Sequence, residues 1–198
     1  MMVKKEDKIQ KKKKIIIDAL KVRLRNDVYS KITVQDIADE AGFSKGGVLH
    51  YFATKEDIYL SLIEDIFNEF DVAHRQILQM GLEADSMAPM SALVGVENFI
   101  LDKTNIRIII NLILYAFEDE KILKILKTYI SRLRIFYDNI IINDRKSVPT
   151  RRRSDLDVKY LSRIVQTIVI FIGILESIDP IELDHVEIVK YVTSLLKA

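Results

Sequence analysis

The sequence predicts an all-α protein of about nine helices, in which a small three-helix domain precedes a larger helical domain. Two observations predict this class. Apolar residues recur at helical spacing along most of the chain, and only 6 Gly and 3 Pro in 198 residues provide turn signals. An apolar fraction of 49% is enough for a sizeable core, and 30% charged residues favour a soluble protein. We place the domain boundary between residues 53 and 54.

The N-terminal domain is predicted from its helix signals. A first helix is expected over residues 8–25, after a lysine-rich start that is either solvated or an arm touching phosphates. Thr33 caps a second helix, because its hydroxyl can accept the backbone N–H groups that open it. Gly42 ends that helix, since glycine takes positive φ at no steric cost. Ser44 then opens a third helix, so residues 33–52 have a helix-turn-helix pattern.

Six further helices are predicted for the larger domain. Thr54 opens the first of them, whose wide apolar stripe suits packing against both domains. Gly81–Pro89 and the basic segment 143–154 are expected to be loops. Asp155 caps the fifth helix, and Asp179-Pro180-Ile181-Glu182 combines a cap, a first-turn proline and an acidic third position at the start of the last. The expected helices cover residues 55–80, 90–101, 105–117, 119–143, 156–177 and 180–196.

The helix expected over residues 156–177 is apolar nearly all round. A helix without a polar face must be covered on two sides. Its own domain is one cover, and we expect a second subunit to be the other.

The amino-acid composition of the chain limits the kinds of functional site it can contain and the kinds of partner it can bind. The chain has no cysteine, which excludes disulfides, thiolate metal sites and cysteine nucleophiles. Residues 1–55 hold 13 Lys and Arg against 7 Asp and Glu, whereas the remainder holds 17 against 22. The basic N-terminal part therefore favours a polyanion as its partner.

No segment predicts export or membrane insertion. The apolar run Ile15–Ile17 is too short for the core of a signal peptide. The most apolar run, Ile164–Leu175, is interrupted by Gln166 and is shorter than the roughly 20 residues that cross a bilayer. We therefore expect a cytoplasmic protein with no membrane partner.

The third helix has the features of a DNA-reading element. In a helix-turn-helix the second helix enters the major groove, and its leading residues face base edges and phosphates. Small residues there allow close approach, and lysine can pair with phosphate or guanine acceptors. Free N–H groups at helix starts also favour phosphate. The predicted DNA contacts are Thr33, Ser44, Lys45, Gly46, Gly47, His50, Tyr51 and Lys55.

Four segments near this helix carry a family pattern: Thr33-Val34-Gln35-Asp36-Ile37-Ala38, Ala41-Gly42-Phe43-Ser44-Lys45-Gly46, His50-Tyr51-Phe52 and Thr54-Lys55-Glu56. Together they resemble the TetR family of transcriptional regulators, and beyond them the likeness is one of helix number and length. The resemblance implies a homodimer on a palindromic double-stranded DNA operator, a repressor role and release by a small ligand. It also implies that the last two helices pair with their mates in the dimer. The interface residues we expect are Ile164, Ile168, Phe171, Leu175, Val189 and Val192.

Two residues depart from the family pattern. The family often has Thr and Tyr where this chain has Gly47 and Leu49. Gly47 weakens the helix by roughly 1 kcal/mol relative to alanine, and Leu49 removes a possible polar contact with DNA. An operator sequence therefore cannot be carried over from the family.

The larger domain offers aromatic residues and a few polar residues in apolar surroundings. Ligand pockets are usually apolar with a few placed polar groups, so we expect a small, mostly apolar effector there. The candidate effector contacts are Phe67, Phe70, His74, Phe99, Asn111, Tyr115, Tyr137, Gln166 and Phe171.

A catalytic interpretation has little support. The three histidines lie on different expected helices, and no phosphate loop, metal-ligand spacing or nucleophile elbow occurs. We predict no catalytic residue, no metal and no cofactor. The leading hypothesis is a ligand-responsive dimeric repressor. The alternatives are a DNA-binding regulator without a small-molecule effector, tuned by a protein partner, and a helical enzyme or scaffold.

Overall fold

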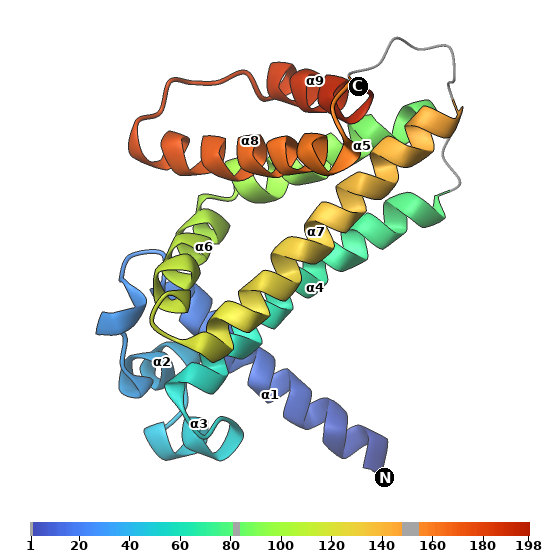
Figure 1. The fold of residues 1–198 in the computed structure, drawn as a ribbon. Helices are drawn as coiled ribbons and strands as arrows, with labels where there is room; N and C mark the ends of the chain where they lie inside the picture. Colours follow the sequence, from blue (N-terminus) through green and yellow to red (C-terminus); the bar gives the residue numbers. More distant parts are fainter. Residues whose placement is uncertain (1, 81–83, 148–154) are drawn as a thin grey trace. The chain divides into compact units, whose positions relative to one another are not determined.

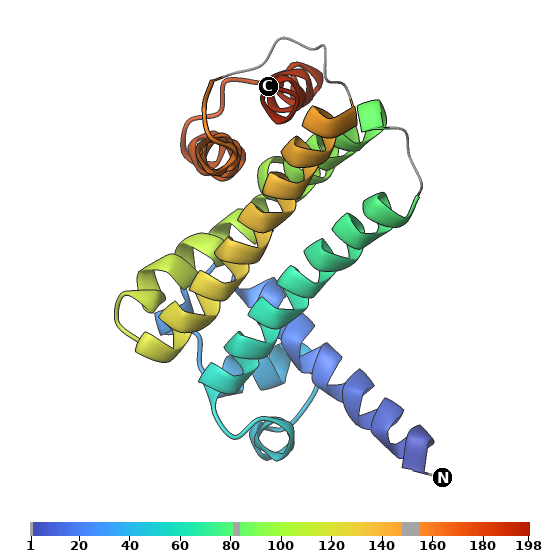
Figure 2. The same ribbon diagram turned by 45° about the vertical axis from the view of Figure 1, so that its right-hand side comes forward.

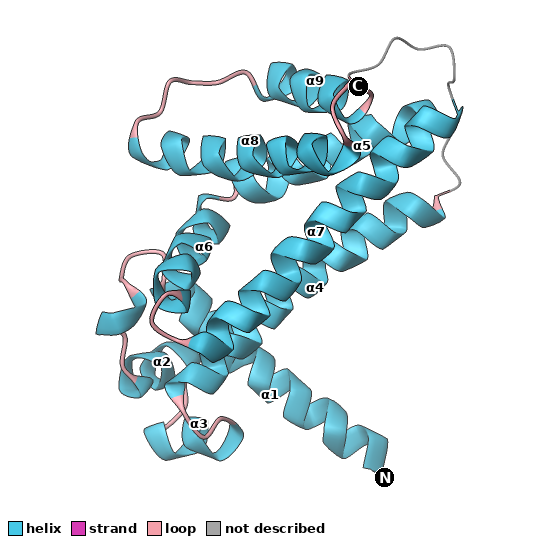
Figure 3. Cartoon of the chain, viewed as in Figure 1, coloured by secondary structure: helices cyan, strands magenta, loops and turns pink. Residues whose placement is uncertain are grey.

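The computed structural model describes residues 2–80, 84–147 and 155–198, and every regular element in those ranges is a helix (Figure 3). The predicted all-α class is confirmed, with nine α-helices among the described residues. The elements are α1 (Met2–Arg23), the 3-10 helix η1 (Tyr29–Lys31), α2 (Val34–Ala41), α3 (Lys45–Tyr51), α4 (Lys55–Gln79), α5 (Ala84–Val96), the π-helical turn η2 (Glu97–Leu101), α6 (Lys103–Ala116), α7 (Glu120–Ser147), α8 (Val158–Ile178) and α9 (His185–Leu196).

The chain forms two compact units, Met1–Asn68 and Glu69–Ala198, which we call unit 1 and unit 2. The predicted domain boundary at residue 53 lies just before α4, and the two units divide inside that helix. Helix α4 therefore contributes its first half to unit 1 and its second half to unit 2.

Unit 1 is held together by packing of α1 against α2 and α3 (Figure 1). Its core includes the fully buried side chains of Ile16, Leu20, Ile37 and Val48. Gly42 closes α2 with a φ of 69°, a left-handed conformation that glycine takes without steric cost. The helix-turn-helix predicted from the sequence is thus formed by α2 and α3.

In unit 2, α5 packs against α7 and α9, while α8 packs against α7, α9 and η2. Figures 1 and 2 show α8 and α9 side by side. Buried aliphatic side chains fill the space between these helices, among them Ala88, Ala92, Val96, Ile106, Val165 and Val169.

Helix α8 approaches η2 closely at Gly173. A Cβ atom placed on Gly173 would lie 1.9 Å from the carbonyl oxygen of Phe99 and 2.8 Å from Cδ1 of Ile106. No side chain fits in that space, so the absence of one at residue 173 allows the backbones of α8 and η2 to meet.

A loop was predicted over Gly81–Pro89. The prediction is wrong from Ala84 onward, because α5 begins at Ala84 and contains Pro89. Proline removes one helical hydrogen bond. Here burial outweighs that cost, since Ala88 and Ala92 on either side of it are fully buried in unit 2. Residues 81–83 lie outside the described part of the chain.

The expected loop at 143–154 is also shorter than predicted, since α7 continues to Ser147. Tertiary contacts account for the extension. Asp144 is buried, and the Arg145 guanidinium donates to the carbonyl of Ala198 at 3.1 and 3.2 Å. Pro149 and the three arginines at 151–153 lie outside the described residues.

The predicted starts of the last two helices were wrong. Asp157, not Asp155, caps α8, and its carboxylate accepts the backbone N–H of Lys159 at 3.0 Å. Helix α9 begins at His185 rather than after Asp179, with Asp184 as its cap. Glu182 has a φ of 52°, which breaks a helix at that point, and the Ile181 N–H donates to the Glu176 carboxylate instead.

Helix α8 extends the apolar run Ile164–Leu175 on both sides. The helix has 21 residues, and its most apolar 18-residue window has a mean hydropathy of 1.8, so by length and composition alone it could cross a membrane. The core helix of a soluble protein meets the same criterion. In this structure 33% of the apolar window is buried, and Ile164, Phe171, Leu175 and Ile178 are exposed.

Candidate nucleic-acid interface

Helix α3 is fixed in unit 1 by its start and by one core residue. The Ser44 hydroxyl accepts the backbone N–H of Gly47 at 3.0 Å, which caps the helix. Val48 is fully buried and anchors α3 to the rest of the unit. The remaining residues of α3 are therefore turned outward or lie at the edge of the core.

Six predicted DNA contacts come together on α3 and its cap. Ser44, Lys45, Gly46 and His50 are exposed, whereas Gly47 and Tyr51 are half-buried. The Tyr51 ring packs edge-on against His50, with centroids 5.1 Å apart, and against Phe43 at 6.1 Å. The result is a polar outward face with a lysine at one end and two aromatic rings at the other.

Thr33 is used within its own helix. Its hydroxyl accepts the Asp36 N–H at 3.2 Å and donates to the Asp36 carboxylate at 2.7 Å, while its backbone N–H donates to the same carboxylate at 2.8 Å. These bonds, the hydroxyl bond first, lower the pKa of Asp36. The cap predicted at Thr33 is confirmed, and Asp36 completes it as a capping box. A DNA contact by Thr33 remains a prediction.

Lys55 is engaged inside unit 1. Its Nζ donates to the carbonyls of Tyr29 and Ile32 at 3.1 and 3.0 Å and lies 4.2 Å from the centre of the Tyr29 ring. The Tyr29 ring in turn stacks on Tyr59 at 4.1 Å. Lys55 thus ties η1 to the start of α4, a role that no local pattern could reveal because its partners lie over 20 residues away.

Three consecutive lysines of α1 lie against the helix-turn-helix or α4. Lys12 is 5.1 Å from the ring of Phe43, which directly precedes Ser44, and Lys13 is 5.2 Å from the ring of Phe52. Lys14 pairs with Asp65 of α4 and with Asp18. The sequence showed that this region is basic but could not assign these separate partners.

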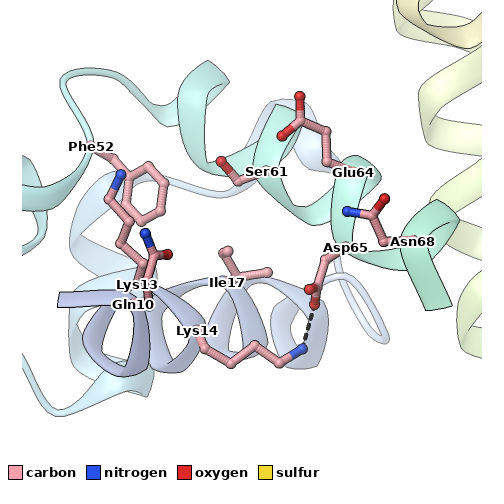
Figure 4. A pocket seen from close by; sticks show the side chains of 9 residues that line it. All are labelled: Gln10, Lys13, Lys14, Ile17, Phe52, Ser61, Glu64, Asp65 and Asn68. Atoms are coloured by element: carbon pink, nitrogen blue, oxygen red, sulfur yellow. Dashed lines mark hydrogen bonds and ion pairs between the residues drawn. The ribbon is translucent and has the colours of Figure 1, made fainter. Parts of the chain in front are cut away.

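A groove of about 400 Å³ lies between α1 and α4 within unit 1 (Figure 4). Lysines and carboxylates both line it, and the Lys14–Asp65 pair bridges its two helices. Because opposite charges compensate there, the groove does not favour a ligand of either charge.

In unit 2, four predicted effector contacts form an aromatic cluster. Phe70 stacks on Phe99 with ring centres 4.6 Å apart, and His74 lies 6.3 Å from Phe70 and 6.5 Å from Tyr137. The sequence missed Phe136, whose ring stacks on His74 at 3.8 Å. The sequence indicated Phe136 only through its position next to Tyr137, a predicted effector contact.

His74 is the polar member of this aromatic cluster. It is 5% exposed, and its Nε2 has no hydrogen-bond partner. Burial lowers the pKa of His74 from 6.5 to about 4, because the charged imidazolium is poorly solvated there. The imidazole is therefore neutral near pH 7.

The other predicted effector contacts lie elsewhere. Gln166 is buried and donates to the carbonyl of Ile130 at 2.8 Å, while Asn111 donates to the carbonyl of Arg107 at 2.9 Å. Tyr115 is half-buried, and Phe171 is 55% exposed. Phe67 is a buried residue of unit 1.

The six residues predicted for the dimer interface differ in their exposure to solvent. Ile164, Phe171 and Leu175 of α8 are exposed, whereas Ile168 and Val189 are half-buried. Val192 is fully buried within its own chain, so its side chain belongs to the core of unit 2.

The arrangement of α2 and α3 defines a helix-turn-helix DNA-binding protein. Residues 26–62 match the model of the bacterial regulatory proteins of the TetR family. A Bacillus subtilis HTH-type transcriptional regulator, YfiR, is 34% identical over 67 residues, which are 34% of this chain and 32% of the relative. The HTH-type transcriptional repressor KstR2 of Rhodococcus jostii is 33% identical over 73 residues, 37% and 35% of the two chains. The N-terminal part of the chain is thus similar to the TetR family, and the matched residues span about a third of the length of these relatives.

Solved structures share the fold over nearly the whole chain. A TetR transcription regulator from Haloarcula marismortui is 16% identical with a TM-score of 0.76, covering 94% of this chain and 95% of the other. FadR from Bacillus subtilis in complex with stearoyl-CoA is 19% identical with a TM-score of 0.75, covering 93% and 97%. A transcriptional regulator from Saccharomonospora viridis in complex with choline is 16% identical with a TM-score of 0.76, covering 95% and 96%.

Proposed function

We propose that the protein is a dimeric transcriptional repressor that binds a palindromic operator and is released by a small, mostly apolar effector. The observation that carries this proposal is the outward face of α3, where Lys45, Gly46 and His50 are exposed on a capped recognition helix. The repressor role is supported by the name of one relative, KstR2.

The test of DNA binding is Lys45→Ala. We expect about tenfold weaker binding to a duplex from upstream of the protein's own gene, since one phosphate or guanine contact contributes about 1–3 kcal/mol. A gel-shift titration measures it. Lys124→Ala removes the same charge from an exposed position on α7 and should leave affinity unchanged. Equal affinity of Lys45→Ala and wild type would remove Lys45 from the interface.

The homodimer is supported by the uncovered apolar face of α8. Besides Phe171 and Leu175, Ile178 is 74% exposed on the same helix. Apolar faces of this kind on a folded chain mark interaction sites. A two-fold dimer would bring two copies of this face together and hold two recognition helices roughly 34–36 Å apart, one turn of DNA.

Leu175→Glu is expected to convert the dimer to a monomer, because a charge would be buried at the interface without a partner. Sedimentation velocity would show the change in mass, and circular dichroism would show that the helices remain. Leu123→Glu on α7 is the matched control, since Leu123 is 45% exposed and Leu175 51%. A Leu175→Glu variant that remains as dimeric as wild type would contradict the proposal.

Two neighbours in fold support an effector, one solved with stearoyl-CoA and one with choline. The aromatic cluster of unit 2 offers apolar rings and one unpartnered nitrogen on His74. Helix α4 belongs to both units, so a ligand that shifts its second half would also move its first half. Such a ligand weakens operator binding only if it prefers the shifted state.

A further inference from the structure

The outward face of α3 carries one large aliphatic side chain. Leu49 is 41% exposed, whereas its neighbour Val48 is fully buried. Val48 accounts for the apolar anchoring of the helix, so Leu49 is not needed for that purpose. Leu49 is therefore free of the core and available to a partner that docks on the outward face of α3.

The position of Leu49 on the helix directs it toward the leading end of α3. Leu49 follows Lys45 by four residues and Gly46 by three, so the three share one face. Long side chains of a helix lean toward its N-terminus and cover the preceding turn. A Cβ atom placed on Gly46 would meet nothing within 4 Å. The Leu49 side chain therefore stands beside an open strip of backbone, on the same face of the helix as Lys45.

This surface suits a particular group in the major groove. Base edges there present hydrogen-bond donors and acceptors, and the only apolar group is the C5 methyl of thymine. The open backbone at Gly46 lets the groove floor come close, and Leu49 then provides an apolar contact beside a lysine that pairs with phosphate or guanine. We propose that Leu49 reads a thymine methyl in each operator half-site. This inference rests on the proposed function and adds a specificity determinant to it.

The experiment removes the methyl alone. The full chain would first select a duplex from a random pool, and each thymine of that duplex would then be replaced in turn by deoxyuridine. Wild type is expected to lose about fourfold in affinity at one thymine per half-site, the contribution of one buried methyl-sized group. Leu49→Ala should bind the thymine and deoxyuridine duplexes equally at that position. Leu49→Met, which keeps an apolar side chain of similar size, should retain the discrimination.

Each outcome has a separate meaning. Uniform insensitivity of wild type to deoxyuridine, or a Leu49→Ala variant as sensitive as wild type, would overturn the assignment of Leu49 while leaving DNA binding intact. Failure of wild type to select any sequence would instead overturn the proposed function. Leu123→Ala, which changes an exposed leucine of unit 2, should keep the wild-type pattern and serves as the control.

Discussion

Gly173→Ala is expected to destabilise unit 2 by about 3 kcal/mol or more, a large value for one added methyl group. The new Cβ would lie 1.9 Å from the backbone oxygen of Phe99. A backbone atom cannot turn aside as a side chain can. Helix α8 would have to move away from η2, and the buried contacts between them would loosen. Urea denaturation followed by circular dichroism would measure the change in the free energy of unfolding.

Gly95→Ala is the matched control for that measurement. A Cβ on Gly95 would meet the Tyr137 hydroxyl oxygen at 3.2 Å and Cγ1 of Val169 at 3.4 Å, both side-chain atoms. These atoms can shift slightly, and alanine favours the helix by about 1 kcal/mol over glycine. The expected change is therefore small. A Gly173→Ala protein within about 0.5 kcal/mol of wild type would show that α8 and η2 are not in this contact.

The second large effect concerns pH. We expect the free energy of unfolding to fall in acid because His74 is buried in its neutral form. Above pH 6.5 the imidazole is neutral in both the folded and unfolded chain. Between pH 6.5 and about 4 the unfolded chain binds a proton that the folded chain does not, so the free energy of unfolding falls as pH falls. Below about pH 4 both forms are protonated and this contribution levels off. The full loss is about 3 kcal/mol.

His74→Phe isolates this contribution, because it keeps a ring against Phe136 and removes the titrating group. Its free energy of unfolding should decline less than that of wild type between pH 6.5 and 4. His185→Gln changes an exposed histidine and should follow wild type. Parallel declines for wild type and His74→Phe would mean that His74 is not the group responsible.

Local signals predicted the N-terminal unit well because they act over three or four residues. Thr33 with Asp36, Gly42 and Ser44 each determine a helix end through bonds within one turn. The same reasoning failed at Asp179-Pro180, where an equally strong start signal is followed by a left-handed Glu182. There the hydrogen bond from Ile181 to Glu176 competes with a new helix.

The candidate site was predictable only where its residues are consecutive. Lys45 to Tyr51 lie on one short helix, so the pattern alone placed them together. Lys55 was predicted as a DNA contact from its place at a helix start, and its carbonyl partners on Tyr29 and Ile32 could not be foreseen because they become neighbours only after folding. Phe136 likewise joins His74 across 62 positions of sequence, a contact that apolar periodicity cannot identify.

The division of the chain inside α4 has a consequence for the construction of hybrid regulators. A DNA-reading module cut at residue 53 would lose the buried residues Ile58, Tyr59, Leu62 and Ile63, which are the α4 part of its core. It would also lose Lys55 and its hold on η1. A transplantable module must therefore carry α4 through Asn68, and the junction with a foreign sensor must be made in continuous helix.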